Sequence, residues 1–80
     1  MKNKLPNIHP GEILREEFLT PMGISAYRLS KETGLPHSRV SDLLAGRRGV
    51  SADTALRLAR YFGTTPDFWL NLQSTYDLEE

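Results

Sequence analysis

Apolar residues recur at helical spacing along most of the chain. In residues 10–19, for example, Ile13, Leu14 and Phe18 fall on one side of a helix. Later segments repeat this pattern, and none alternates apolar and polar residues as a half-buried strand would. The pattern therefore predicts five helices, over residues 10–19, 25–33, 36–45, 52–62 and 66–78.

Proline, glycine and serine mark where these helices begin and end. Pro21 and Gly23 are expected to break the chain after the first helix. Ser25 can cap the second helix, and Gly34 can end it in the left-handed conformation that glycine adopts at low cost. Two helices joined by a short glycine turn are typical of a helix-turn-helix, which we expect over residues 25–45.

These elements predict one all-α domain with no internal repeat and no dividing linker. We expect residues 1–8 to be a flexible N-terminal segment and residues 9–80 to form a single helix-turn-helix domain. A chain of 80 residues buries only about 60% of the surface of its unfolded state, so its core is thin. Dimerisation would stabilise such a domain.

The composition favours a cytoplasmic protein. There is no cysteine, which excludes disulfides and cysteine-based zinc sites and fits a reducing compartment. The N-terminal MKNKLPN has two lysines but no apolar run after them, as a signal peptide would require. No segment reaches the length of a membrane span, so we expect no association with membranes.

Charged residues are unevenly distributed, although the chain is neutral overall. Residues 27–60 contain seven basic and three acidic side chains, whereas residues 61–80 contain four acidic side chains and no basic one. A basic middle and an acidic end point to two different partners. A merely solvated surface is the alternative, and the charge counts alone favour it.

The helix expected at residues 36–45 has an apolar side and a polar side. Successive helical residues turn by about 100°, which places Val40, Leu43 and Leu44 together toward the core. The remaining surface carries imidazole, hydroxyl, guanidinium and carboxylate groups from His37, Ser38, Arg39, Ser41 and Asp42. Short polar side chains of this kind fit the major groove of DNA and can read base edges. Taken singly, each is explained equally well as a solvated residue, and Asp42 can pair with Arg39 instead.

Arg47 and Arg48 follow at the exit of this helix, in a turn flanked by glycines. The planar guanidinium group binds phosphate through two hydrogen bonds and keeps its charge at all relevant pH values. The pair can grip the DNA backbone, reach a neighbouring minor groove, or simply be solvated. Combined with the turn and the polar helix surface, it favours DNA binding in a chain whose total charge is zero.

The last predicted helix has more apolar residues than a thin core needs. One stripe of its helical wheel holds Phe68, Trp69, Leu72 and Tyr76, and Leu70 falls outside it. Phe68, Trp69 and Leu72 can all be explained as core residues, and we expect this of Phe68 and Leu72. Trp69, Leu70 or Tyr76 is expected to serve a homodimer interface, where aromatic residues often anchor binding. A two-fold dimer can place two recognition helices about 34 Å apart, one turn of the duplex.

Catalysis has little support in the sequence. His9 and Glu12 lie three positions apart at a helix start, as metal ligands sometimes do, but two ligands make a poor zinc site. Glu12 is better explained by the preference of acidic residues for a helix N-terminus. There is no nucleophile–base pair at short spacing and no phosphate-binding glycine loop. We therefore expect no enzymatic activity, metal or cofactor.

The central stretch SAYRLSKETGLPHSRVSDLLAGRRGVSADTALRLARYFG resembles the helix-turn-helix of the phage-repressor-like (XRE) transcription factors. The flanking HPGEILREEFLTPMGIS and TTPDFWLNLQSTYDL narrow the resemblance to the HigA (VapI-type) antitoxins of bacterial addiction modules, over residues 9–78. The opening HPGE and the closing FWLNLQ are more specific than the central motif. The resemblance implies a five-helix repressor fold and a homodimer that binds a palindromic operator and represses its own operon.

The same resemblance implies a cognate toxin similar to RelE-type (HigB) ribonucleases, which cut messenger RNA on the ribosome. The residues themselves do not establish this partner, because four carboxylates near a solvated end are ordinary. A stand-alone XRE-type regulator without a toxin is therefore the nearest alternative. An interaction module that uses the helical fold without DNA is another.

The resemblance also implies roles for particular residues. Base contacts would come from the start and outer side of the third helix, at His37, Ser38, Ser41 and Asp42. Phosphate contacts would come from Ser25, Tyr27, Arg28, Arg39, Arg47 and Arg48. The chain departs from many repressors at Pro36, which replaces a serine or threonine cap and cannot donate an amide hydrogen to phosphate. Glutamine and asparagine readers are also missing, so adenine recognition by a side-chain amide is not expected.

Overall fold

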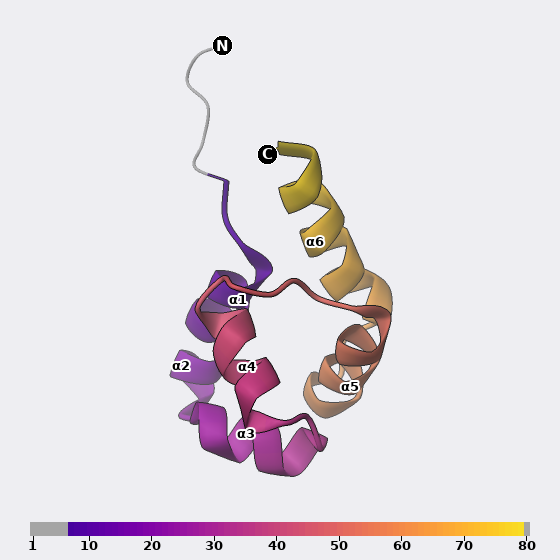
Figure 1. The fold of residues 1–80 in the computed structure, drawn as a ribbon. Coiled ribbons are helices and arrows are strands. Elements are labelled where there is room, and N and C mark those ends of the chain that lie inside the picture. The colour runs from indigo at the N-terminus through magenta and orange to yellow at the C-terminus, as the bar shows by residue number, and fades with distance from the viewer. Residues whose placement is uncertain (1–6, 80) are drawn as a thin grey trace.

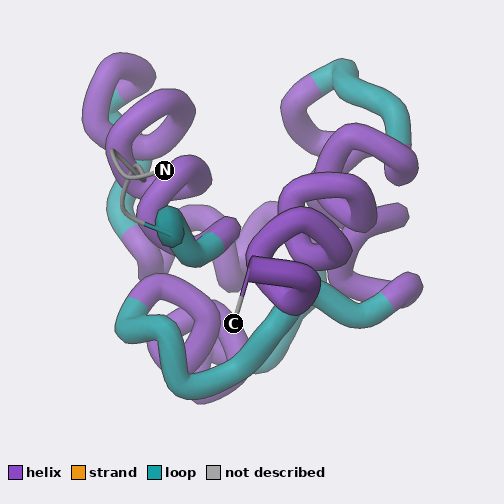
Figure 2. The backbone as a smooth tube through the Cα atoms, turned by 90° about the horizontal axis from the view of Figure 1, so that it is seen from above, coloured by secondary structure: helices purple, strands orange, loops and turns teal. Residues whose placement is uncertain are grey.

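The computed structural model describes residues 7–79, and its regular elements are all helical (Figure 1). In chain order they are α1 (Pro10–Ile13), η1 (Leu14–Leu19), α2 (Thr20–Met22), α3 (Ala26–Thr33), α4 (His37–Leu44), α5 (Ala52–Phe62) and α6 (Pro66–Glu79). No strand occurs within residues 7–79 (Figure 2). Because α1, η1 and α2 follow one another without a break, they form one helix, and the predicted five-helix all-α fold is confirmed.

The first helix runs further than its sequence predicts. A break is expected at Pro21, but the helix continues to Met22 and ends at Gly23. Its middle segment, η1, is π-helical, and the amide of Thr20 donates to the carbonyl of Arg15 five positions back. The wider π turn accommodates the Pro21 ring, which would clash with the preceding turn of a regular α-helix.

Hydroxyl side chains begin three of the later helices, and the cap predicted at Ser25 is confirmed. Ser25 Oγ accepts a hydrogen bond from the third amide of α3 at 3.0 Å, and Ser51 Oγ does the same for α5 at 3.3 Å. Thr65 Oγ1 accepts from the Phe68 amide at the start of α6. Each bond satisfies an amide that has no partner inside its helix, a contribution of about 1 kcal/mol.

Apolar side chains from the first helix, α3, α4, α5 and α6 meet in the core. Its largest fully buried members are Leu14, Leu29, Val40, Leu43, Leu58 and Trp69. The predicted inner side of α4 is confirmed for Val40 and Leu43, which are each 1% exposed, whereas Leu44 is partly buried against the core. Burying a side chain of this size contributes about 1.5–3 kcal/mol, so this set provides much of the stability.

The chain N-terminal to α1 lies beside the C-terminal half of α6 (Figure 1). Asn7 Nδ2 donates to the carbonyl of Tyr76 at 3.1 Å, and the His9 ring meets the Tyr76 ring edge-on at 4.9 Å. Residues 1–6 of the flexible segment predicted for residues 1–8 lie outside the described residues. None of the helices in the described part is long and apolar enough to cross a membrane.

Candidate nucleic-acid interface

A short turn joins α3 to α4, the two helices of the predicted helix-turn-helix. Gly34 ends α3 with a φ of 80°, in the left-handed region that disfavours other residues. Leu35 follows and is only 2% exposed. Its carbonyl accepts a hydrogen bond from Ser30 Oγ at 2.7 Å. A buried side chain and a hydrogen bond to α3 therefore fix the turn and hold α4 in place.

The outer face of α4 carries the four predicted base-reading residues, His37, Ser38, Ser41 and Asp42. The first two are exposed and the other two are half-buried. Pro36 stands at the N-cap position and makes no side-chain hydrogen bond to α4, so no side chain blocks the first amides of the helix. Uncapped amides at a helix N-terminus attract anions such as phosphate. The start of α4 is therefore accessible to a ligand such as DNA.

Asp42 pairs with the loop that leaves α4, here called the exit loop (residues 45–51). Arg47 donates from Nε and Nη2 to Asp42 Oδ1, at 3.0 and 2.9 Å. The predicted alternative, a pair between Asp42 and Arg39, is wrong, because Arg39 Nη1 donates to Asp53 Oδ2 at 2.9 Å. The outer face of α4 and the exit loop thus form one connected polar surface.

Asp53, in the first turn of α5, accepts hydrogen bonds from two arginines. Arg39 reaches it from α4, and Arg57 Nε lies 3.2 Å from Asp53 Oδ1. These donors, Arg57 first, hold the pKa of the Asp53 carboxyl below its ordinary value. Arg57 Nη1 also donates to the carbonyl of Thr33 at 3.0 Å, which ties α5 to the end of α3. Sequence reasoning missed Arg57, although its position four residues after Asp53 is a signal for such a pair.

Glu32 on α3, like Asp53 on α5, accepts hydrogen bonds from two side chains. Arg28 Nε lies 3.1 Å from Glu32 Oε2, and the hydroxyl of Tyr61 on α5 donates to Glu32 Oε1. The hydrogen bonds from Tyr61 and then Arg28 lower the pKa of Glu32. The contact with Glu32 raises the pKa of Tyr61 for the same reason. Arg28 is thus held along α3 by a carboxylate that α5 also fixes.

All four arginines predicted to contact phosphate lie within 4.0 Å of a carboxylate oxygen. Arg47 and Arg48 share Asp42, yet their side chains remain 63% and 50% exposed. Ion pairs on a surface contribute only about 0–1 kcal/mol. The carboxylates therefore hold these guanidinium groups near the surface through contacts that cost little to break.

The two other predicted phosphate contacts lie at the start of α3. Ser25 Oγ accepts from the Arg28 amide, which leaves its hydroxyl hydrogen able to donate. Tyr27 is 62% exposed, and its ring lies 6.4 Å from the ring of His37. Lys31 Nζ lies 5.7 Å from the same tyrosine ring. The start of α3 therefore stands next to the start of α4, and both present hydrogen-bond donors.

Trp69 on α6 lies in the core and not at the surface that a dimer contact requires. It is fully buried, its ring centre lies 5.0 Å from that of Phe18, and its Nε1 donates to Thr64 Oγ1 at 2.8 Å. It has no surface left for a partner, so its assignment to a dimer interface is wrong. Phe68, expected in the core, is instead 37% exposed. The side of α6 that faces the core is therefore centred on Trp69, and Phe68 lies at its edge.

The other predicted dimer contacts on α6, Leu70 and Tyr76, are half-buried. Leu70 packs against the edge of the core, and Tyr76 contacts the chain before α1. Leu72, predicted in the core, also packs against it as a partly buried residue. Leu78 near the end of α6 is 85% exposed. Part of the side-chain surface of Leu70 and Tyr76 therefore remains open to a partner.

His9 and Glu12 serve the helix start instead of pairing as ligands. His9 Nδ1 accepts a hydrogen bond from the Gly11 amide at 2.9 Å and so caps α1. Glu12 is exposed in the first turn, where a carboxylate favours the helix dipole. Residues 7–79 contain no cluster of three or more histidine, cysteine, aspartate or glutamate side chains that could hold a metal ion.

Known proteins are similar to this chain over most of its length. The helix-turn-helix family matches residues 14–69. Virulence-associated protein I of Dichelobacter nodosus is 55% identical over 78 residues, which cover 98% of this chain and 72% of that protein. Antitoxin HigA-1 of Vibrio cholerae is 44% identical over 78 residues, covering 96% and 72%. The solved structure of Pseudomonas aeruginosa antitoxin HigA with the higBA promoter is 49% identical, has a TM-score of 0.90 and covers 92% of this chain and 80% of that one.

Proposed function

Because the chain belongs to the helix-turn-helix family that includes the HigA-type antitoxins, we propose that it is a DNA-binding repressor of its own operon and an antitoxin. The observation that carries the proposal is the accessible outer face of α4 next to the arginines of the exit loop. A similar antitoxin, solved with its promoter, supports the same use of the fold. Repression follows if the bound protein occupies DNA that the transcription machinery needs.

In this proposal α4 enters the major groove and the surrounding donors hold the backbone. His37, Ser38, Ser41 and Asp42 would read base edges, and Asp42 would accept from a cytosine amino group. Phosphates would be bound by Ser25, Tyr27, Arg28, Arg39, Arg47 and Arg48. The ion pairs of these arginines would exchange their carboxylates for DNA phosphates on binding.

We propose that the protein acts as a homodimer on a palindromic operator. A single domain of this size buries too little surface for tight specific binding, and two recognition helices about 34 Å apart fit successive major grooves. Leu70 and Tyr76 on α6 remain candidates for the contact between the two copies. Light scattering gives the mass directly, and a monomer at the concentrations that bind DNA would contradict this part.

The proposed second partner is a toxin of the RelE or HigB type, a ribonuclease, in the bacterial cytoplasm. It is supported by the similarity to proteins named antitoxins, not by any residue of this chain. The product of the gene next to this one is the candidate, and the two should co-purify when expressed together. Growth arrest by that product, relieved by this chain, would support the antitoxin role. Neither result would be obtained for a stand-alone regulator.

DNA binding is tested by fluorescence anisotropy with the duplex from just upstream of its own gene and a shuffled duplex of equal composition. We expect the upstream duplex to bind at least about a thousand-fold more tightly. A dimer with six to ten phosphate contacts should lose roughly a thousand-fold or more in affinity between 50 and 200 mM salt. Equal, salt-independent affinities for the two duplexes would overturn the proposal and favour a protein-interaction module.

A further inference from the structure

The exit loop is held at both ends by parts of the chain outside the helix-turn-helix. It carries Arg47 and Arg48 and runs past α1 and then past the start of α6 before α5 begins (Figure 1). At its beginning the amides of Gly46 and Arg47 donate to the carbonyls of Leu43 and Asp42, at 3.1 and 2.8 Å. A loop with two glycines has little stiffness of its own, so its position depends on its neighbours.

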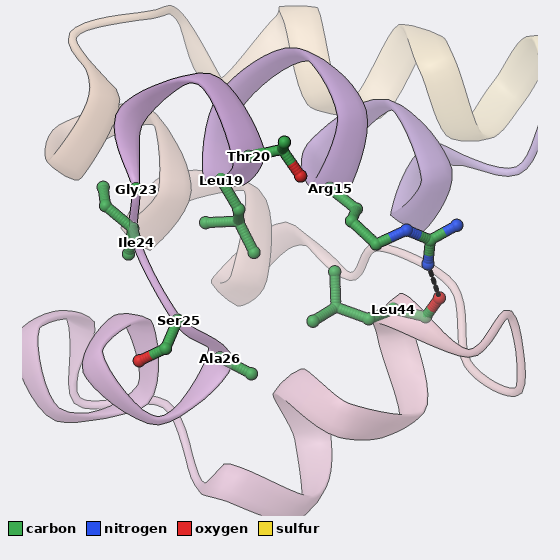
Figure 3. A pocket seen from close by; sticks show the side chains of 8 residues that line it. All are labelled: Arg15, Leu19, Thr20, Gly23, Ile24, Ser25, Ala26 and Leu44. Atoms are coloured by element: carbon green, nitrogen blue, oxygen red, sulfur yellow. Dashed lines mark hydrogen bonds between the residues drawn. The ribbon is translucent and has the colours of Figure 1, made fainter.

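At its beginning the exit loop is fixed by the first helix. Arg15 Nη1 donates to the carbonyl of Leu44 at 3.1 Å, at the edge of a pocket between the first helix and the start of α3 (Figure 3). Gly11 lies so close to α4 that a side chain there would meet the Leu43 carbonyl oxygen at 1.9 Å. The HPGE motif therefore packs its glycine directly on the end of the recognition helix.

At its far end the exit loop is fixed by Gln73 of α6. Gln73 Oε1 accepts the Val50 amide at 2.8 Å, and a side chain on Gly49 would come within 2.7 Å of the same oxygen. Gln73 Nε2 donates to Asp77 Oδ1 at 2.8 Å, which turns the amide so that its oxygen faces the loop. The close approach of loop backbone and side chain, with a second hydrogen bond setting the amide orientation, defines a specific contact.

We propose that Gln73 is a positioning residue for DNA binding, which holds Arg47 and Arg48 where they meet the phosphate backbone. The proposal rests on the proposed function. Gln73 touches neither arginine, so it acts through Val50 and Gly49. It connects α6 to the DNA-binding surface, and any partner that moves α6 would change the position of the exit loop.

Three variants separate this role from a general effect on folding. Gln73→Leu removes the acceptor for the Val50 amide at similar size, whereas Gln73→Glu combined with Asp77→Asn keeps an oxygen acceptor and restores a hydrogen bond between positions 73 and 77. Asn71→Leu is the matched control, because Asn71 is an exposed amide on the same helix. Amide hydrogen exchange of Val50, measured by NMR without DNA, should rise about tenfold or more in Gln73→Leu only. An unchanged exchange rate would overturn the proposal.

The second measurement is the affinity for the upstream and shuffled duplexes between 50 and 200 mM salt. Gln73→Leu should weaken both about tenfold and reduce the slope of log affinity against log salt by one to two, as loss of phosphate contacts does. The Gln73→Glu/Asp77→Asn variant should retain most of the binding. In an Arg47→Ala/Arg48→Ala background, Gln73→Leu should cause no further loss.

A purely structural role of Gln73 would give a different result. Gln73→Leu would then lower the melting temperature, keep the wild-type salt slope and weaken the double-arginine variant as much as the wild type, and this outcome would overturn the proposal. If the wild-type protein binds neither duplex, the proposed function fails. Val50 exchange would still decide whether Gln73 fixes the loop, so the two failures are distinguishable.

Discussion

The helices α4 and α6 both combine apolar and polar residues, but they contact the rest of the molecule differently. α4 buries Val40 and Leu43 on one side, and on its outer face His37 and Ser38 are exposed. α6 has neighbours on two sides. Trp69 enters the core, while Gln73 and Tyr76 contact the exit loop and the chain before α1.

The outer face of α4 is therefore available to bind a ligand, whereas much of the surface of α6 is occupied by contacts within the protein. The outer face of α4 holds short polar side chains that support no neighbouring element except through Asp42. The corresponding polar residue of α6, Gln73, is used to hold a loop in place. Substitutions on the outer face of α4 should therefore change binding without changing stability, whereas substitution of the buried Trp69 of α6 should do the reverse.

The largest effect is expected for Trp69→Ala. Loss of the only fully buried aromatic side chain among residues 7–79 leaves a cavity and should cost about 3–5 kcal/mol of unfolding free energy, measured by urea denaturation. Leu78→Ala on the same helix is the control and should change stability by less than about 0.5 kcal/mol. Similar losses in the two variants would show that α6 does not owe its place to Trp69.

The clean periodicity of α4 is why its inner side could be predicted, whereas α6 was assigned incorrectly at Trp69 and Phe68. A helical wheel assumes that a helix has one buried side. α6 meets α5 with one part of its surface and the exit loop with another, so apolar and polar contacts interrupt its stripe. Which residue of the stripe lies deepest depends on how α5 and the first helix pack against α6. The periodicity of α6 alone carries no information about that packing.

The second largest effect is expected for Asp42→Ala, measured as preference among duplexes that differ at one base pair. Preference should relax at one position by about 1–3 kcal/mol of discrimination if the carboxylate reads cytosine. Asp67→Ala on α6 changes the net charge equally and should leave preference unchanged. A uniform change for all duplexes would mean instead that Asp42 only holds Arg47.

Arg47→Ala should weaken binding to every duplex alike, by about tenfold or more, because it removes one phosphate contact from each copy of the proposed dimer and lowers the salt slope by about two. The measurement is anisotropy with the upstream and shuffled duplexes at several salt concentrations. Arg60→Ala removes an exposed arginine of α5 and should have a smaller effect. Loss confined to the upstream duplex would indicate that Arg47 reads a base.

The sequence indicated which side chains stand on the candidate interface, but not how they pair. Helical spacing placed His37 and Ser38 on the outer face of α4, and the structure finds both exposed. The partner of Arg39 is Asp53, fourteen positions later on another helix. Contacts over such separations depend on how two helices pack, so local spacing could not reveal this one, nor the contact from Gln73 to Val50.

The smallest effect is expected from acidification. The pKa values of Glu32 and Asp53 lie below their ordinary values of 4.5 and 3.8, because hydrogen-bond donors stabilise the carboxylates in the folded state. Their stabilising contribution is therefore present above these ordinary values and is lost as the pH falls through the lowered ones. The melting temperature of a Glu32→Gln/Asp53→Asn variant should fall less on acidification than that of the wild type. Parallel curves would contradict this assignment.

Amide chemical-shift mapping by NMR, with the upstream duplex added stepwise to the labelled protein, tests most directly whether α4 and the exit loop bind DNA. We expect the largest changes at residues 25–28, 37–42 and 47–48, with smaller changes at Val50 and Gln73. Changes concentrated in the C-terminal half of α6, with the amides of residues 37–42 unaffected at saturation, would contradict the assignment of α4 and the exit loop to DNA binding.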